Sequence, residues 1–327
     1  MSGGIVVVTD HDFEDLSVER EVLDGVADVT ALADDVGVDP DEGAARDALR
    51  DADGVLNLRY ELDADTIARM DDCRVIARYG VGVDNVDLEA ATDRGICVTN
   101  VPGYCLEEVA THAVTLLLGL LRGLPQYRES IAAGGWDREA APPAHRLSTL
   151  TAGVVGFGAI GRTVAERLVP VVDEVVASDP FVGGEEMAGH GVEKVPFEEL
   201  LARSDAVTVH SPLTDETRGL FDAGAFDRMR DRAVLVNVAR GPIVDTDDLH
   251  AALEAGTVAG AGLDVFPEEP PASDHPLRDH SSVLVTPHVA WYSEESNAER
   301  RQRAAEAVRT ALTGGRPDHV VNETRQS

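Results

Sequence analysis

A glycine-rich hexapeptide, Gly156-Phe157-Gly158-Ala159-Ile160-Gly161, constrains the fold of this chain more than any other feature. It follows a short apolar run at 153–155 and precedes a helix-like stretch at 162–168. In a strand–turn–helix of this kind the first glycine allows a tight turn. The second lets the backbone approach a phosphate, and the third lets helix and strand pack closely. The motif therefore predicts a dinucleotide-binding unit, with the phosphates at the helix N-terminus.

Asp179 follows the next apolar run, at 174–178. A carboxylate at this position can accept hydrogen bonds from the adenosine ribose and repels a 2′-phosphate, so it predicts NAD rather than NADP. The alternative is that Asp179 only begins a turn with Pro180.

Two other glycine pairs do not begin a dinucleotide-binding unit. We interpret the pair in 80–82 as part of a substrate loop, and the pair in 260–262 as close strand packing.

Short apolar runs alternate with helix-like stretches along the whole chain, which is typical of parallel α/β sheets. We expect strands at 5–9, 29–32, 54–58, 75–78 and 96–99, and then six more at 153–155, 175–178, 206–210, 233–238, 259–263 and 283–286. The expected helices include 42–50, 65–70, 106–121 and 162–168, and a last helix that is capped by Ser293 and ends at Gly314. The six strands of the second set match the doubly wound pattern of dinucleotide-binding domains.

The charge of the chain is strongly acidic. It has 28 basic and 60 acidic residues, a formal net charge of −32, and a single lysine, Lys194. Such a surface repels nucleic acid and anionic membranes, and neither is an expected partner. At high salt, charges repel one another only within a few ångströms. The composition therefore predicts a halophilic protein adapted to a salt-rich cytosol. The alternative is an ordinary acidic enzyme.

The remaining composition predicts a cytoplasmic protein without a metal. The three cysteines, Cys73, Cys97 and Cys105, are an odd and sparse set without a CxxC pair, which argues against a disulfide framework and a zinc site. No run approaches the roughly 20 apolar residues of a membrane span. The first residues also lack the pattern of a signal peptide.

Three side chains that can do chemistry each follow a predicted strand: Arg240, Glu269 and His288. Ligands of an open parallel sheet bind outside the carboxyl ends of its strands, so we expect all three in one crevice. Arg240 can hold a substrate carboxylate in its planar fork. His288 can donate a proton to a ketone oxygen, and Glu269 can orient its ring. Each residue alone could merely cap a turn or face solvent, but the ordered set favours reversible hydride transfer between NAD and a 2-oxo or 2-hydroxy acid.

The segments GFGAIG, HSPLTDET, VNVARG, DVFPEEP and TPHVAWYS, in this order, resemble the D-isomer-specific 2-hydroxyacid dehydrogenase family over nearly the whole chain. That family includes phosphoglycerate, glycerate, formate and D-lactate dehydrogenases. The run from His288 to Asp318 looks closer to its C-terminal-binding-protein branch. The resemblance implies two doubly wound parallel-sheet domains. A Rossmann NAD-binding domain, 102–288, would be inserted in a flavodoxin-like substrate domain, 1–101 and 289–327.

The resemblance also implies the binding residues. Backbone N–H groups of Val81 and Gly82 would bind the substrate carboxylate together with Arg240 and His288, with Arg78 nearby, and Trp291 would line the substrate side chain. The implied NAD contacts are Gly156, Gly158, Ala159, Ile160, Gly161, Asp179, Ser211, Pro212, Thr217, Val238, Ala239, Arg240, Asp264 and His288. The helix at 106–121 would form a homodimer through its apolar run 114–118, although that run could instead be intradomain core. The chain departs from the family pattern at Thr149, Thr111 and Val109.

Three alternatives compete with a dehydrogenase that acts on a small, unphosphorylated 2-oxo acid. A D-3-phosphoglycerate dehydrogenase would want extra cations near the cleft, of which the sequence has few, and we expect no regulatory extension beyond Ser327. An NAD(H)-sensing interaction protein is disfavoured by the intact Arg/Glu/His set and by the acidic surface. A hydrolase is disfavoured because neither HExxH nor GxSxG occurs.

Overall fold

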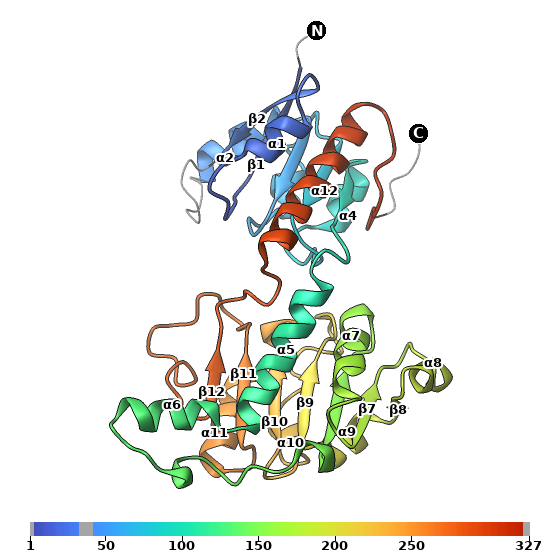
Figure 1. Ribbon diagram of the computed structural model, residues 1–327. Helices are drawn as coiled ribbons and strands as arrows, with labels where there is room; N and C mark the ends of the chain where they lie inside the picture. The colour runs from blue at the N-terminus through green and yellow to red at the C-terminus, as the bar shows by residue number, and fades with distance from the viewer. Residues whose placement is uncertain (1–2, 33–41, 323–327) are drawn as a thin grey trace. The chain divides into compact units, whose positions relative to one another are not determined.

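The computed structural model describes residues 3–32 and 42–322. Its chain divides into two compact units: unit 1 comprises residues 1–104 and 293–327, and unit 2 comprises residues 105–292. The sheets of both units are parallel in the described residues, with helices along their faces, so the expected fold class is confirmed (Figure 1). The unit boundaries fall a few residues after the expected ones. One reason is that Val289 and Ala290 hydrogen-bond to Asp264 of unit 2.

Unit 1 has, among its described residues, a five-stranded sheet in the order β2-β1-β3-β4-β5. This is the order of a flavodoxin-like doubly wound sheet. The strands are β1 Gly4–Val8, β2 Ala27–Ala31, β3 Gly54–Asn57, β4 Val75–Arg78 and β5 Cys97–Thr99. The helices are α1 Ser17–Val22, α2 Glu42–Arg50, α3 Ala64–Ile67, α4 Leu88–Asp93 and α12 Glu294–Leu312.

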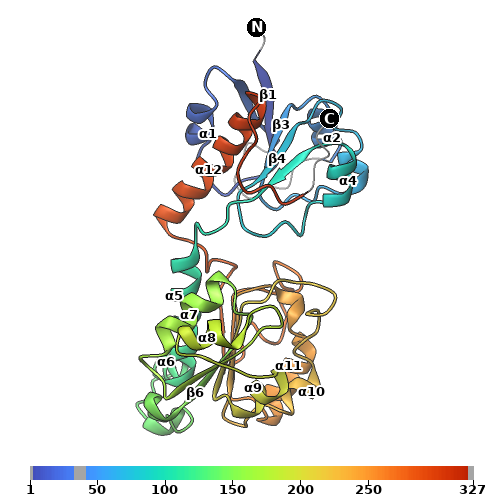
Figure 2. The ribbon, with the colours of Figure 1, turned by 90° about the vertical axis from the view of Figure 1, so that its right-hand side faces the viewer.

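Helix α12 completes unit 1, although almost 200 residues separate it from β5 in the sequence. It lies along α1, β3 and β4 in both ribbon views (Figures 1 and 2). The predicted cap is present: the Ser293 hydroxyl accepts the Ser296 N–H at 2.9 Å, and Ser296 closes a capping box. Gly54 leaves room for the helix, since a Cβ there would lie 3.0 Å from Val308 Cγ1.

Unit 2 has seven strands in the part of the chain that the structure describes, in the order β12-β11-β10-β9-β6-β7-β8. The strands are β6 Thr151–Val155, β7 Glu174–Ser178, β8 Glu193–Lys194, β9 Ala206–Val209, β10 Val234–Asn237, β11 Gly260–Leu263 and β12 Val283–Val285. The helices are α5 Leu106–Leu121, α6 Leu124–Ala132, α7 Ala159–Leu168, α8 Gly184–Gly189, α9 Phe197–Arg203, α10 Ala223–Phe226 and α11 Thr246–Ala255, with 3₁₀ turns η1 Arg138–Ala140, η2 Leu147–Thr149 and η3 Gly241–Ile243.

The expected count of six strands in this unit is wrong by one. β8 is missing from the prediction because it contains only two residues, Glu193 and Lys194, and both are exposed. It is defined by its ladder to β7, where Val176 pairs with Glu193 and Ala177 with Lys194. A strand of this kind carries no apolar alternation in the sequence.

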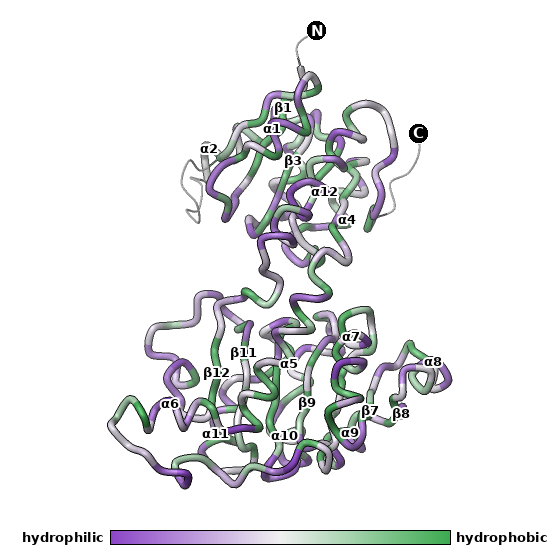
Figure 3. The backbone as a smooth tube through the Cα atoms, in the orientation of Figure 1, coloured by the Kyte–Doolittle hydropathy of each residue, from purple (hydrophilic) through white to green (hydrophobic). Residues whose placement is uncertain are grey.

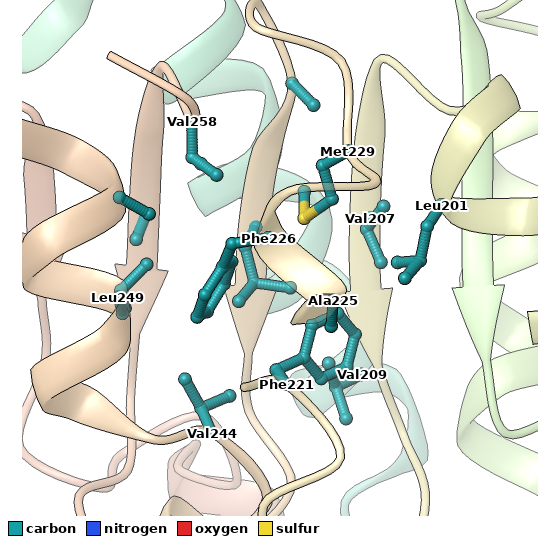
Figure 4. Packing of buried hydrophobic residues seen from close by; sticks show 14 of the residues in the cluster. Leu201, Val207, Val209, Phe221, Ala225, Phe226, Met229, Val244, Leu249 and Val258 are labelled. Atoms are coloured by element: carbon teal, nitrogen blue, oxygen red, sulfur yellow. The ribbon is translucent and has the colours of Figure 1, made fainter. Parts of the chain in front are cut away.

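The core of unit 2 lies between its sheet and helices α9, α10 and α11 (Figure 4). Phe221 is fully buried, with Phe197 edge-on at 5.5 Å and Phe226 at 6.3 Å between ring centroids. Burying one such side chain is worth about 1.5–3 kcal/mol. Helix α5 covers β9 to β12 from the other face (Figure 2), and the strands between these layers are predominantly apolar (Figure 3). The glycine turn and the predicted catalytic loops therefore extend from a rigid, doubly covered sheet.

Candidate active site

The glycine turn between β6 and α7 fits the predicted phosphate cradle. Gly156 has a φ of 89°, and a Cβ there would lie 2.7 Å from the Ser211 backbone nitrogen. A Cβ on Gly161 would lie 2.0 Å from the Gly156 carbonyl oxygen. In contrast, a Cβ on Gly158 would meet nothing within 4 Å, and Gly158 and Ala159 are exposed. The first and third glycines thus allow close packing, and the second leaves the N-terminus of α7 open to an anion.

Asp179 links this turn to the next loop. Its carboxylate accepts the backbone N–H of Phe157 at 2.7 Å, and those of Phe181 and Val182 at 2.8 and 3.2 Å. The residue therefore does begin a turn, as the alternative interpretation had it, but it also lies against the glycine turn. The two interpretations do not exclude each other, and a contact between Asp179 and a ribose stays a prediction.

The other predicted cofactor positions follow β9 and β10 at the same edge of the sheet. The close approach of Gly156 fixes Ser211 beside the glycine turn. The Thr217 hydroxyl donates to the Pro212 carbonyl at 2.7 Å and accepts the Thr214 N–H at 2.7 Å, which closes a compact turn. After β10, Val238 is buried and Ala239 is half-buried.

His210, at the end of β9, received no role from the sequence. Its backbone N–H donates to the Val155 carbonyl at 2.7 Å, and its Nε2 lies 2.9 Å from the Thr208 hydroxyl. Burial lowers the pKa of His210 from 6.5 to about 3, so its ring is neutral at ordinary pH. The one available signal was its place at the end of an apolar run, which is also where ordinary turn residues lie.

The loops that carry Arg240 and Glu269 pack directly against each other. A Cβ on Gly241 would lie 1.9 Å from the Phe266 carbonyl carbon, so only glycine fits between the two backbones. Asn237 holds the first loop by donating to the Arg240 carbonyl at 2.9 Å. The Arg240 guanidinium itself donates to the Ala239 carbonyl at 2.8 Å.

His288 and Glu269 form the pair that the sequence predicted. Nδ1 of His288 lies 2.6 Å from Glu269 Oε2, and Glu269 Oε1 accepts the Phe266 N–H at 3.0 Å. The side chains are 41% and 36% exposed, so the pair is reachable from solvent. The indole N–H of Trp291 donates to the His288 carbonyl at 2.9 Å, which anchors Trp291 to the same loop.

Asp264 lies beneath this loop. Its side chain is only 1% exposed and accepts the backbone N–H groups of Val289 and Ala290, each at 2.9 Å. These contacts are structural, and the predicted contact of Asp264 with the cofactor stays a prediction.

The predicted substrate loop belongs to unit 1. Arg78 donates from Nε to the Gly82 carbonyl at 2.9 Å and from Nη1 to Asn57 Oδ1 at 3.4 Å. Asn100 donates to the Val81 carbonyl at 2.7 Å, and Val81 is 40% exposed. These bonds fix the loop from within unit 1, whereas Arg240, Glu269, His288 and Trp291 are held within unit 2.

Helix α5 shows what the departures from the family pattern do locally. The Thr111 hydroxyl accepts from Arg167 Nη1 at 2.6 Å, which ties α5 to α7, and Val109 is buried. Leu116 and Leu117 are also buried within the unit, and a Cβ on Gly262 would lie 3.1 Å from Leu116 Cβ. Leu116 and Leu117, within the run 114–118, therefore belong to the core of unit 2.

Two further predictions can be compared with the structure. A Cβ on Gly260 would lie 2.8 Å from the Ser282 carbonyl oxygen, so the close strand packing expected there is confirmed. Within residues 3–32 and 42–322, no group of three or more His, Cys, Asp or Glu residues could hold a metal ion, and no helix is long and apolar enough to cross a membrane.

Comparison with known proteins gives one family. Residues 114–290 match the model of the "D-isomer specific 2-hydroxyacid dehydrogenase, NAD binding domain". The chain is 41% identical over 268 residues to a D-3-phosphoglycerate dehydrogenase of Archaeoglobus fulgidus, covering 82% of this chain and 51% of that protein. It is 35% identical over 288 residues to a glyoxylate reductase of Korarchaeum cryptofilum, covering 87% of each.

Among solved structures, the D-lactate dehydrogenase of Aquifex aeolicus complexed with NAD and lactic acid superposes with a TM-score of 0.83 at 29% identity, covering 94% of this chain and 96% of that one. The chain thus spans about half the length of the D-3-phosphoglycerate dehydrogenases it matches, but nearly the whole length of the smaller relatives. The special likeness to the C-terminal-binding-protein branch stays a prediction.

Proposed function

We propose that this chain, which belongs to the D-isomer-specific 2-hydroxyacid dehydrogenase family, is an NAD-dependent dehydrogenase that interconverts a small 2-hydroxy acid and its 2-oxo acid. The observation that carries the proposal is the Glu269–His288 pair, joined at 2.6 Å. The backbone of the Arg240 loop packs against the segment from which Glu269 extends. An acid–base group and a carboxylate-binding cation therefore come from adjacent loops of one sheet.

The residues of unit 2 fit NAD. Gly156 and Gly161 stand where a Cβ would clash, Gly158 leaves the turn open, and the exposed N-terminus of α7 suits a pyrophosphate. Asp179 lies against the turn, where a carboxylate favours a free ribose hydroxyl over a 2′-phosphate. When bound, the nicotinamide supplies or accepts the hydride.

His288 is the proposed acid–base residue. Since Glu269 engages Nδ1, we assign the proton transfer to Nε2. In the reducing direction Nε2 donates a proton to the substrate carbonyl oxygen, and in the oxidising direction it takes that proton back. Glu269 fixes the plane of the ring, because its second oxygen is itself held by the Phe266 N–H.

Arg240 is proposed to bind the substrate carboxylate and to polarise the adjacent carbonyl. Its backbone is fixed on both sides, by Asn237 and by the packing of Gly241 on Phe266, so the guanidinium extends from a rigid base. Arg78, Val81 and Gly82 of unit 1, with Trp291 of unit 2, are proposed to complete the substrate site.

For the substrate we propose a small unphosphorylated acid such as glyoxylate or hydroxypyruvate. The glyoxylate reductase match, which covers 87% of each chain, supports this choice. D-3-phosphoglycerate dehydrogenase activity is the second candidate, supported by the 41% identity to the protein of that name, of which this chain covers 51%. The cytoplasmic location, the homodimer, the salt adaptation and the absence of nucleic-acid and membrane partners remain proposals that rest on composition and on the family.

The test is a substrate panel measured by NADH absorbance in high KCl, with glyoxylate, hydroxypyruvate, pyruvate and 3-phosphohydroxypyruvate. We expect turnover with an unphosphorylated acid, and its loss in His288→Ala with NADH binding retained. A clear preference for the phosphorylated acid would establish the second candidate instead. NADH binding without turnover of any acid would favour an NAD(H)-sensing interaction protein.

A further inference from the structure

The backbone of His288 adopts an unusual conformation for a residue with a large side chain. Its φ of 54° lies in the left-handed region. A non-glycine residue in this region is strained and persists only where its surroundings hold it there. Whatever holds this conformation also sets the direction of the imidazole.

Asp264 supplies the local restraint. Its backbone carbonyl accepts the His288 N–H at 2.8 Å, and its two carboxylate oxygens accept the N–H groups of Val289 and Ala290, each at 2.9 Å. Three consecutive backbone amides, from 288 to 290, are thus fixed by one residue. This restraint depends on the orientation of the Asp264 carboxylate. The Asp264 side chain is only 1% exposed.

Two further side chains fix that orientation. The Thr286 hydroxyl donates to Asp264 Oδ1 at 2.6 Å, and Nε2 of His112 lies 2.9 Å from the same hydroxyl. A carboxylate only accepts hydrogen bonds, so the single proton of the hydroxyl is committed to Asp264. His112 must therefore donate from Nε2, and the network fixes its tautomer. The chain of donors runs from His112 through Thr286 to Asp264.

We propose that His112, on helix α5, is a positioning residue for His288. Through Thr286 it holds the Asp264 carboxylate in the orientation that fixes residues 288–290, and it touches none of the reacting atoms. This inference rests on the proposed role of His288. Helix α5 packs on β9 to β12, so His112 connects the acid–base loop to a helix that lies across four strands of unit 2.

Two matched pairs of variants test the network. His112→Leu and Thr286→Val remove a hydrogen bond at similar volume, whereas His112→Gln and Thr286→Ser keep a donor or a hydroxyl. We expect kcat to fall about tenfold or more in the first two and to recover largely in the second two, because a small displacement of an acid–base group is costly. The Kd for NADH, measured by fluorescence, should change less than about twofold in all four, because neither His112 nor Thr286 is among the proposed cofactor contacts; twofold corresponds to about 0.4 kcal/mol.

Hydrogen exchange gives a readout that is independent of turnover. Peptides that contain residues 288–290 should exchange faster in His112→Leu and Thr286→Val than in the wild type, and at the wild-type rate in His112→Gln and Thr286→Ser. An unchanged kcat and unchanged exchange in His112→Leu would overturn the inference. So would equal losses in the Leu and Gln variants, because these would indicate mere packing.

If a His112 variant does not fold, Thr286→Val and Thr286→Ser test the same network by kcat and by hydrogen exchange. If the wild type turns over no 2-oxo acid, the proposed function fails, while the exchange data still decide the positioning.

Discussion

Gly241 offers the sharpest test of how the site is assembled, because its hydrogen side chain allows the Arg240 loop to lie against the Glu269 loop. In Gly241→Ala the new Cβ would lie 1.9 Å from the Phe266 carbonyl carbon and 2.1 Å from its oxygen. Ordinary contacts between carbon atoms lie at about 3.5–4.0 Å, so the two backbones must separate by roughly 1.5 Å.

That displacement has two expected consequences. Overpacking costs about 1–3 kcal/mol, and the upper end applies here because the neighbour is backbone rather than a flexible side chain. The melting temperature should fall by several degrees, at about 2–4 °C for each kcal/mol in a domain of this size. Since Arg240 and Glu269 move apart, kcat/KM should fall by about 100-fold.

Gly189→Ala is the matched control. A Cβ on Gly189, the last residue of α8, would meet nothing within 4 Å. Replacing a helical glycine should leave turnover unchanged and raise stability by about 0.5–1 kcal/mol. Both variants are compared by thermal unfolding and NADH turnover in the same KCl buffer. If Gly241→Ala matched the control in both measurements, the two loops would not be in the contact described.

Three other predictions concern conditions and cofactor choice. His210 is held neutral in the folded protein, with a pKa of about 3, and takes up a proton near pH 6.5 once unfolded. Its contribution to stability is therefore complete above pH 6.5 and is lost as the pH falls toward 3, by about 1.4 kcal/mol per pH unit. His210→Gln should have a shallower acid limb of melting temperature against pH, and identical slopes would contradict the assignment. Asp179→Ala should reduce the preference for NADH over NADPH and lower stability, because Phe157 and Phe181 lose their acceptor; an unchanged kcat/KM ratio would locate cofactor choice elsewhere. With a net charge of −32, the protein should melt at a higher temperature as KCl rises toward 1 M, where screening acts over about 3 Å, and a flat response would refute salt adaptation.

Local patterns account for the parts of the fold that the sequence predicted. Helix α5 runs from Leu106 to Leu121 as expected, because a long apolar stretch after Pro102-Gly103 leaves few alternatives. The glycine turn was predictable because Gly156 and Gly161 meet steric needs at a fixed spacing, with Gly158 between them facing open space. The Glu269–His288 pair followed from the rule that ligand sites lie beyond the carboxyl ends of parallel strands.

Features that depend on distant parts of the chain could not be predicted in this way. His112 and Thr286 are 174 residues apart, and neither residue type in its own segment indicates a bond between them. The contact of Gly241 with Phe266 depends on how two loops fold back after β10 and β11. Tertiary structure alone brings such pairs together, so only the three-dimensional structure reveals them.

The late position of α12 in the sequence has a consequence for the order in which the protein is made. Unit 1 closes with a helix whose residues Arg300, Ala304, Ala305 and Val308 are buried, and this helix is translated only after all of residues 105–292. Unit 2 is therefore the first part that can finish folding on the ribosome, while β3 and β4 wait for their covering helix. A nascent chain that stalls before residue 293 would present an open apolar face to chaperones and proteases, because the strands that α12 covers would stay uncovered.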